Sequence, residues 1–382
     1  MKRLKPFLLI SFTVAVFICC GSSDSSSDND NDGVTPPQQC LAPTALSVTL
    51  LNGNTVALEW GAMNGETQWK YVLQSQGMGD PTTEGEDTTT NPLTLTDLNP
   101  SSSYEFYIRA VCTDNNLSPW AGPVSFTTTV PEGYVKVWED HFDGPTINTN
   151  YWTVGTLRDP ESGDIIPGAD GDFLLKDKYS GYVTEEDSYI EDGALVLRNQ
   201  KRAYEGTDPA GSYDYTSGWA MTMHKVYLNK GYIEMRAQFP SGDKVWPALW
   251  LIAEDLVWGP EWDMFEYFGQ NVEGDDVMAM HLFVGEWDSP RWSTGFIFNF
   301  DQEYDCEAWH IYGFQWTEEK AVWSVDGVVK RELLSDGFWA RWPNEDMYLV
   351  FNNEVQTYAT DQTTEWPNYL KIDYVEIYSN QD

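Results

Sequence analysis

Hydrophobic and polar positions alternate along many short segments from residue 41 to the C-terminus. A period of two turns one face of a segment toward a core and the other toward water, which is typical of β-strands. In residues 41–130 these segments recur with turn signals about every 8–12 residues, the spacing of a β-sandwich. Clear examples are residues 56–60, 70–73 and 104–111. The pattern therefore predicts a small all-β domain over residues 39–130.

Residues 133–382 also read as strands, and helical periodicity is scarce in them. A stretch of roughly 250 residues dominated by strands suits one large sandwich or jelly roll. The predicted fold class is thus all-β in both domains. The strands we expect in the second domain are residues 231–239, 246–252, 261–268, 277–283, 310–316, 321–325 and 370–378.

The first 20 residues read as a targeting segment. Basic residues precede an apolar run over residues 7–18, which is too short for a confident membrane-spanning helix. The run ends at Cys19 and Cys20, and the segment resembles a bacterial lipoprotein signal in which a cysteine is lipidated. We expect Cys20 to carry the lipid, with Cys19 as the alternative. An ordinary secretory signal or short anchor remains open.

Residues 21–38 contain mainly Ser, Asp, Asn, Gly and Pro. This composition buries too little apolar area to fold, so the segment reads as a flexible tether. Its acidic part, residues 24–32, resembles the stretch that routes some Bacteroidetes lipoproteins to the cell exterior. We therefore expect an exported lipoprotein of the outer membrane, exposed at the cell surface, with the membrane as a partner through the N-terminal lipid.

The five cysteines divide between the signal and the folded part. Export favours disulfides, and Cys40 and Cys112 flank the first predicted domain, so we expect them to pair. Two buried thiols are the alternative. Cys306 is left single, and we expect it to pack as a small apolar residue.

The charge and the aromatic content of the chain limit the classes of molecule that it can bind. The chain has 22 Lys and Arg against 60 Asp and Glu, a net charge of −38. Nucleic acid is an unsuitable partner because phosphate binding needs clustered cations. The excess of acidic over basic residues also disfavours heavily sulfated polymers as ligands. With 18 Trp and 21 Tyr, the chain is rich in flat side chains on which the apolar faces of sugar rings pack well. Composition therefore favours a neutral polysaccharide.

One strand candidate carries an unusual group of carboxylates. Glu261, Asp263 and Glu266 stand at i, i+2 and i+5, a spacing that a regular strand cannot place on one face. One extra residue bulging out near Met264 and Phe265 would bring all three to the same side. The two glutamate carboxyl groups could then approach to about 5–5.5 Å, the separation found in retaining glycosidases.

The alternative for this segment is an acidic strand that faces solvent. Carboxylates among large apolar residues are partly desolvated, and such groups are usually paired or functional. The apolar neighbours that argue against the alternative are Trp262, Met264, Phe265, Tyr267 and Phe268.

The first domain resembles a fibronectin type III domain. The resemblance rests on Trp60, on the segment 98–104 and on the closing residues 126–128. It implies a seven-stranded sandwich in which Tyr104 is a corner residue. We expect the domain to act as a spacer rather than as a sugar-binding module.

The second domain resembles glycoside hydrolase family 16 along nearly its full length. The resemblance implies a concanavalin-like jelly roll of two curved antiparallel sheets, with a substrate cleft on the concave face. The motifs that carry it, in chain order, are residues 137–144, 150–152, 231–237, 246–251, 261–266, 310–327 and 372–378.

By motif position, the resemblance makes Glu261 the nucleophile, Glu266 the acid/base and Asp263 the residue between them. Like charges this close cannot all ionise freely, so one proton stays in the group, and we expect Glu266 to keep it. The implied reaction is retaining, endo-acting hydrolysis of a β-glucan, either laminarin-like β-1,3 or mixed-linkage β-1,3/1,4. A galactan hydrolase of the agarase, porphyranase or carrageenase type is one alternative, and a non-catalytic surface glycan-binding lipoprotein is another.

Four further residues are candidates for substrate binding. Trp246, Trp250 and Trp258 lie just upstream of the carboxylates, and at least one should stack on a sugar ring. Trp258 is the first choice because Gly259 and Pro260 place it on a loop; core packing is the alternative for the others. His281 lies on the next strand, where the family position suggests that it reaches Glu266. A buried structural histidine is the alternative.

We expect no cofactor, since retaining glycosidase chemistry needs none. Many relatives hold a structural calcium with a Glu where His141 stands and with an Asp like Asp373. Histidine is a poor ligand for calcium, which prefers oxygen, so this site is doubtful here. We expect a monomer.

Overall fold

The computed structural model describes residues 39–112, 116–166, 181–255, 259–270, 276–285, 292–338, 341–356 and 360–380. Within these ranges the chain is built from strands with a few short 3₁₀ turns, which confirms the all-β prediction. No helix in this part of the chain is long and apolar enough to cross a membrane. The predicted signal and tether, including Cys19 and Cys20, lie outside the described residues, and so does Trp258.

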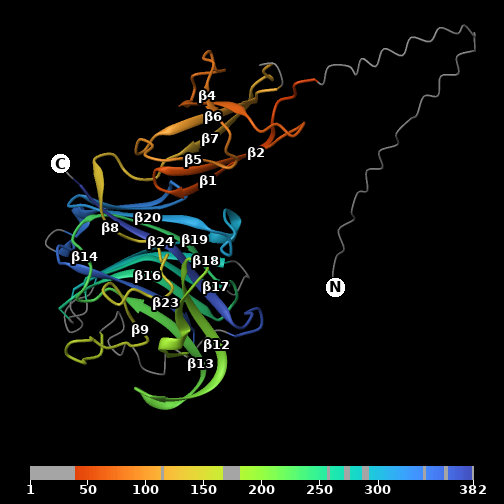
Figure 1. The fold of residues 1–382 in the computed structure, drawn as a ribbon. Coiled ribbons are helices and arrows are strands. Elements are labelled where there is room, and N and C mark those ends of the chain that lie inside the picture. Colours follow the sequence, from red (N-terminus) through yellow and green to blue (C-terminus); the bar gives the residue numbers. More distant parts are fainter. Residues whose placement is uncertain are drawn as a thin grey trace, which may run out of the picture. The chain divides into compact units, whose positions relative to one another are not determined.

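The first domain is a sandwich of two sheets (Figure 1). One sheet has the order β1-β2-β5 and the other β4-β3-β6-β7. Trp60, Trp69 and Phe106 fill the space between them, with Trp60 and Trp69 in edge-to-face contact at 5.4 Å. The seven strands are β1 (Thr44–Asn52), β2 (Thr55–Gly61), β3 (Trp69–Ser75), β4 (Glu86–Thr88), β5 (Leu93–Leu95), β6 (Ser103–Ala110) and β7 (Ala121–Thr127).

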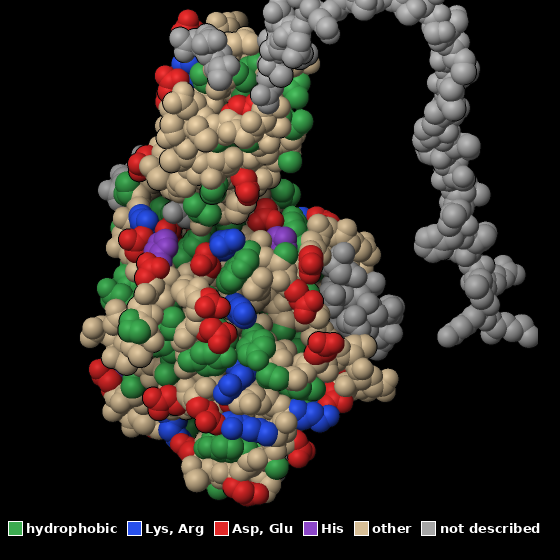
Figure 2. Space-filling view, turned by 45° about the vertical axis from the view of Figure 1, so that its right-hand side comes forward, with side chains coloured by type: hydrophobic (Ala, Val, Ile, Leu, Met, Phe, Trp, Pro, Cys, Tyr) green, Lys and Arg blue, Asp and Glu red, His purple; other side chains and the backbone are tan. Residues whose placement is uncertain are grey.

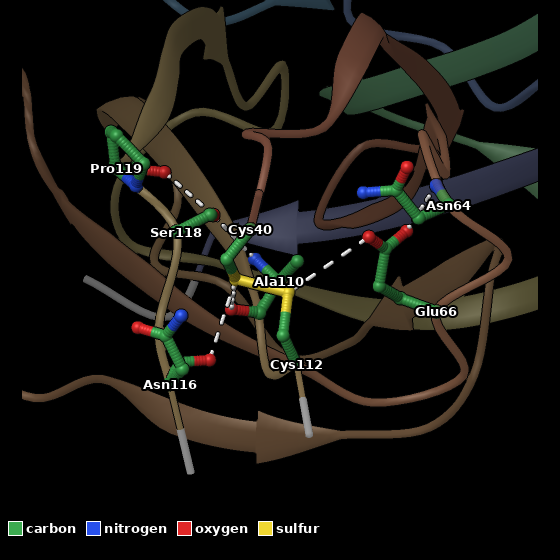
Figure 3. Close-up of a disulfide and its surroundings, with 8 residues drawn as sticks. All are labelled: Cys40, Asn64, Glu66, Ala110, Cys112, Asn116, Ser118 and Pro119. Atoms are coloured by element: carbon green, nitrogen blue, oxygen red, sulfur yellow. Dashed lines mark hydrogen bonds between the residues drawn. A yellow bond between two sulfur atoms is a disulfide. The ribbon is translucent and has the colours of Figure 1, made fainter. Parts of the chain in front are cut away.

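Cys40 and Cys112 form a disulfide with Cα atoms 5.9 Å apart, the pairing that the sequence predicts (Figure 3). The bridge ties the start of the domain to the end of β6. Tyr104 accepts a hydrogen bond from the backbone N–H of Asn99 at 3.1 Å, which is the expected corner contact. Cys306, in the second domain, is buried in the core as expected.

The second domain contains two layers of strands (Figure 1). The outer sheet runs β11-β12-β24-β15-β20-β21-β22, with β8 on β24. The inner sheet runs β9-β13-β23-β16-β17-β18-β19, with β14 on β23. The strands of the second domain up to β16 are β8 (Tyr134–Asp140), β9 (Thr153–Val154), β10 (Gly181–Val183), β11 (Ser188–Glu191), β12 (Ala194–Thr207), β13 (Ala210–Met221), β14 (Tyr227–Leu228), β15 (Gly231–Gln238) and β16 (Val245–Ala253).

The remaining strands include all those predicted in the C-terminal half, with ends shifted by a few residues at most. They are β17 (Glu261–Gln270), β18 (Asp276–Val284), β19 (Trp292–Asn299), β20 (His310–Trp316), β21 (Lys320–Val325), β22 (Val328–Leu334), β23 (Met347–Val355) and β24 (Asn368–Asn380). The hairpin between β21 and β22 turns at Asp326 and Gly327, both with positive φ. This is the Asp-Gly turn that suits the twist of antiparallel strands.

Strand alternation divides the side chains of the inner sheet between two clusters. On β16, Leu249 and Leu251 join the large core that also contains residues of the outer sheet. Trp250 and Ile252 point the other way, into a second cluster. We call this second surface of the inner sheet the site face, because it carries the residues described next.

Candidate active site

A bulge in β17 determines where its side chains point. In the pairing with β16, Leu249 faces Phe265 and Trp250 faces Asp263, so Met264 is the extra residue. Met264 and Phe265 are consecutive, yet both lie in the core between the sheets. The alternation therefore changes phase at this point, as the carboxylate spacing predicts.

The change of phase brings Glu261, Asp263 and Glu266 to the site face, since Trp262, Met264, Phe265 and Tyr267 all occupy the core. The three carboxylates are only 4%, 7% and 9% exposed. Three acidic groups on one strand, withdrawn from water and next to one another, cannot all carry a full charge. The arrangement excludes the solvent-facing acidic strand that was the alternative.

Asp263 is the member of the group that holds a proton most readily. Burial raises the pKa of its carboxyl well above the ordinary value, and the charges of Glu266 and Glu261 raise it further. Once protonated, Asp263 donates to Glu261. Besides burial, the cause of this raised pKa is position, because Asp263 lies between the two glutamates and both negative charges act on it.

Glu266 faces two nitrogen atoms instead. The indole N–H of Trp246 donates to its Oε1 at 2.8 Å. Nδ1 of His281 lies 3.3 Å from its Oε2 and 3.9 Å from Oδ2 of Asp263. With one contact on each oxygen, the orientation of the Glu266 carboxyl is fixed.

His281 reaches this position because its neighbour on β19 is a glycine. His281 pairs with Gly295, and a Cβ on residue 295 would lie 2.3 Å from the imidazole ring. The ring also stacks on Phe283 at 5.7 Å. A larger residue at position 295 would push His281 away from Glu266.

Trp250 forms part of the floor beneath the group. Its indole N–H donates to Oδ1 of Asn352 at 2.7 Å, and its ring meets Trp219 edge to face at 5.9 Å. At 5% exposure it leaves little ring area for a sugar, so packing describes it better than stacking. Asn352 also donates to the backbone carbonyl of Trp246 at 3.3 Å, which links the two tryptophans.

The structure thus brings Trp246, Trp250 and His281 to the same face as the carboxylates. Trp246 is half-buried and packs at 5.6 Å from the ring of Phe268. The sequence analysis missed Asn352 and Gly295. Both act through partners on other strands, and no local spacing in the sequence marks such residues.

The residues of the doubtful calcium site have other partners. Asp373 accepts a charged hydrogen bond from Arg236 at 2.7 Å. His141 lies between Glu139 and Glu376, at 3.1 and 3.0 Å, and the Lys136 ammonium is 3.1 Å from Glu376. A histidine and a lysine among the carboxylates give a donor set and a charge balance that do not fit calcium.

Two family models match the chain. The model for glycosyl hydrolases family 16 matches residues 176–376, and the model for the fibronectin type III domain matches residues 41–127. The first match spans more than half of the chain and includes the bulged strand. The chain belongs to glycosyl hydrolases family 16.

Curated relatives and solved structures agree with this family. The chain is 27% identical to glucan endo-1,3-beta-glucosidase A1 of Niallia circulans over 271 residues, which is 65% of this chain and 38% of the relative. It is 27% identical to the beta-glucanase of Rhodothermus marinus over 269 residues, 63% of this chain and 84% of the relative. The laminarinase catalytic domain from Thermotoga maritima MSB8 superimposes with a TM-score of 0.56 at 27% identity, covering 66% of this chain and all of that domain.

This family 16 chain spans only part of several relatives. It covers 38% of the Niallia protein and 50% of endo-1,3-1,4-beta-glycanase EglC of Rhizobium meliloti, to which it is 27% identical.

Proposed function

We propose that this family 16 protein is a retaining, endo-acting hydrolase of a β-glucan with β-1,3 or mixed β-1,3/1,4 linkages. The observation that supports this most strongly is the bulge at Met264, which gathers Glu261, Asp263 and Glu266 on one buried face. A surface that only binds sugar has no need of three crowded carboxylates.

In the first step the Glu261 carboxylate attacks the anomeric carbon, and the bond from that carbon to the leaving oxygen breaks. Glu266 gives its proton to that oxygen. The step requires the neutral form of Glu266. The product of this step is a glycosyl ester on Glu261.

In the second step Glu266, now ionised, takes a proton from water, and the water oxygen attacks the anomeric carbon. The ester bond breaks, Glu261 leaves as carboxylate, and the original configuration is restored. Asp263 donates a hydrogen bond to Glu261 throughout and moderates its charge, while Trp246 and His281 hold the Glu266 carboxyl in position.

A neutral glucan is the substrate class that fits best. The relatives at 27% identity are named as glucanases, and the chain carries a net charge of −38. On the face drawn in Figure 2, Lys and Arg side chains are mixed with acidic ones and do not form one basic surface. Such a mixture offers little to a densely sulfated polymer.

The test is the release of reducing ends from a panel of laminarin, mixed-linkage β-glucan and agarose, with Glu261→Gln as the control. We expect rapid release from one or both glucans and none from the control. Release from agarose alone would replace the β-glucan assignment with a galactan one. Binding without release from any polymer would overturn the hydrolase assignment.

We further propose that the protein works at the cell surface as a monomer without a cofactor, tethered to the outer membrane through Cys20, with the fibronectin type III domain as a spacer. The membrane tether and the cell-surface location rest on residues 1–38, and the spacer role rests on the domain order. Cys20→Ala should move the protein from the membrane to the soluble fraction in the native host. If only Cys19→Ala does so, the lipid is on Cys19; if neither does, the anchor is not a lipid on this pair.

A further inference from the structure

Residues 157–166 form a small hairpin that packs on the site face. A bridge between Arg158 and Ile165 closes it, with a hydrogen bond from the Ile166 N–H to the Leu157 carbonyl at 3.0 Å. Leu157 and Ile166 belong to the same hydrophobic cluster as Trp250. The hairpin therefore packs into the hydrophobic cluster that contains Trp250, the partner of Asp263 on β16.

The hairpin also borders a hollow. A cavity of about 100 Å³ is lined from the hairpin by Leu157, Arg158 and Ile165, and from across it by Tyr182 and Asp208. Arg158 anchors one side of the hairpin, donating from Nε and Nη2 to the two carboxylate oxygens of Asp208 at 2.5 and 2.7 Å. This anchor is partly exposed, so by itself it contributes little stability.

The second anchor is a histidine between two carboxylates. Nε2 of His224 lies 2.7 Å from Oδ1 of Asp159 on the hairpin, and Nδ1 is in close contact with Glu254, just after β16. A neutral imidazole has only one N–H, so its other nitrogen would face a carboxylate with a lone pair. Only the imidazolium donates to both. We call this trio the histidine clamp.

The surroundings of His224 favour its charged form. Burial alone lowers the pKa of the imidazole, but the hydrogen bonds to Asp159 and Glu254 and the charge of Glu161 outweigh it, so the pKa lies above the ordinary value. Tyr227 is a further titratable group at the clamp, and its hydroxyl donates to Glu254.

The clamp lies near the end of β16 that pairs with Glu261, because Glu254 follows this strand and Ile252 pairs with Glu261 of β17 and with Tyr348 of β23. The pKa of Tyr348 is raised by burial first and then by the charges of Asp159, Glu261 and Glu254. One hydroxyl on β23 thus feels both carboxylates of the clamp and the carboxylate that we assign as nucleophile.

We propose that His224, held as an imidazolium between Asp159 and Glu254, is a positioning residue that fixes the 157–166 hairpin as a wall of the glycan site. The inference rests on the proposed glycan hydrolysis for its activity readout. The wall role predicts weaker glycan binding when the clamp opens, with the chemistry at Glu261 and Glu266 largely unchanged.

The pH dependence follows from the two pKa shifts. The raised pKa of His224 means that the clamp is fully formed below the ordinary histidine pKa of about 6.5 and is lost as pH rises through the raised value. Asp159 acts in the opposite direction. Burial raises its pKa, but hydrogen bonds from Glu161, His224 and Ser162 lower it to about 2 overall, so its contribution persists down to about that pH. The clamp should therefore open on the alkaline side.

The experiment compares His224→Asn with His310→Asn in the full chain. Residue 224 has a φ of +61°, a conformation that asparagine tolerates, and asparagine cannot bridge both carboxylates. His310 is a matched control, because its nitrogens contact Asp326 and the Asp305 carbonyl on the outer sheet. We expect His224→Asn to raise KM for a glucan oligosaccharide about tenfold with kcat within about twofold, and His310→Asn to change neither.

The pH profile separates positioning from general destabilisation. In the unsubstituted protein KM should rise as pH increases above neutrality, and in His224→Asn it should be high and flat. An unchanged KM and profile in His224→Asn would overturn the inference. Should that variant fail to fold, Glu254→Gln must show the same rise in KM, and an unchanged KM there overturns the inference equally.

Hydrogen exchange gives a readout that needs no turnover. Amides of residues 157–166 should exchange faster at pH 9 than at pH 6, after correction for intrinsic rates, and His224→Asn should exchange fast at both. If this holds but no glycan is cleaved by the unsubstituted protein, the proposed function fails while the clamp stands. Equal protection in both proteins at both pH values would overturn the clamp itself.

Discussion

Two clusters in the second domain contain the same kinds of residue but differ in charge balance. Asp263, Glu266 and His281 lie on the inner sheet, and Glu139, His141 and Glu376 lie on the outer one. In each cluster the potential ligand atoms lie within 4.8 Å of one another. Residue type and proximity alone would therefore give both clusters the same role.

The outer cluster is neutralised. Burial alone raises the pKa of Glu376, but His141, Tyr378 and Lys136 lower it overall, so the carboxylate is stable as an ion. Hydrogen bonds that His141 donates to the carboxylates of Glu376 and Glu139 keep its pKa raised, although burial alone would lower it. Each charge has a partner of opposite sign, which describes a structural ion network.

In the inner cluster, by contrast, buried carboxylates repel one another. Asp263 is buried between Glu261 and Glu266, and its raised pKa records that crowding. A proton that is held by repulsion can be moved at low cost when a substrate changes the local charge. The difference teaches that unbalanced charge, more than the presence of acidic residues, marks the reaction centre.

The largest expected effect comes from the two glutamates. Glu261→Gln and Glu266→Gln should each lower kcat by about a thousandfold or more, since each removes a group that makes or breaks a bond. Glu139→Gln on the outer sheet is the matched control and should keep kcat within about twofold. Initial rates on laminarin, with circular dichroism to verify folding, measure this. Loss of activity in Glu139→Gln would contradict the claim that only the inner cluster takes part in the reaction.

Asp263→Asn should have a smaller effect, about ten- to a hundredfold in kcat. Asparagine still donates to Glu261 and is neutral like the protonated carboxyl, but it cannot release or take up the proton. The variant should also be at least as stable as the parent at pH 7, because a neutral amide replaces a carboxyl whose ionisation is disfavoured there. A large drop in melting temperature would show that Asp263 supports the fold instead.

Trp246→Phe should lower kcat by up to about tenfold with little change in stability. The substitution keeps the ring beside Phe268 and removes only the N–H that orients Glu266, a contact of about 0.5–1.5 kcal/mol. Trp250→Phe offers a comparison, because its N–H serves Asn352 and not a reacting group. A greater loss of kcat in Trp250→Phe would contradict the assigned roles.

The smallest effect belongs to His141→Ala, which should leave activity at 25 °C unchanged and lower the melting temperature by a few degrees, about 2–4 °C. Because the pKa of His141 is raised, its contribution is present below about pH 6.5 and is lost as pH rises through the raised value. The difference in melting temperature from the parent should therefore be larger at pH 6 than at pH 9. Thermal scans at both pH values check this.

Much of the inner site could be anticipated from local sequence. The spacing of Glu261, Asp263 and Glu266 is compatible with one face only through a bulge, and the apolar pair Met264 and Phe265 supplies it. The positions of the strands likewise follow from the alternation of hydrophobic and polar residues. Both the bulge and the strands depend on residues that are neighbours in the chain, so they can be predicted from the sequence.

The rest depends on contacts between distant strands. Asn352 meets Trp250 across 102 residues, and His224 meets Asp159 across 65. Nothing near His224 in the sequence distinguishes it from an exposed loop histidine. The raised pKa of Asp263 likewise depends on burial, which only the folded sheet defines.

The most direct test of the account is to trap the glycosyl ester with a 2-deoxy-2-fluoro-glucosyl fluoride of the preferred glucan and to map the labelled peptide by mass spectrometry. The account predicts one sugar adduct on the peptide that contains residues 261–266, located at Glu261, and no adduct in Glu261→Gln. A label on another residue, or turnover that inverts the anomeric configuration and forms no adduct, would contradict it.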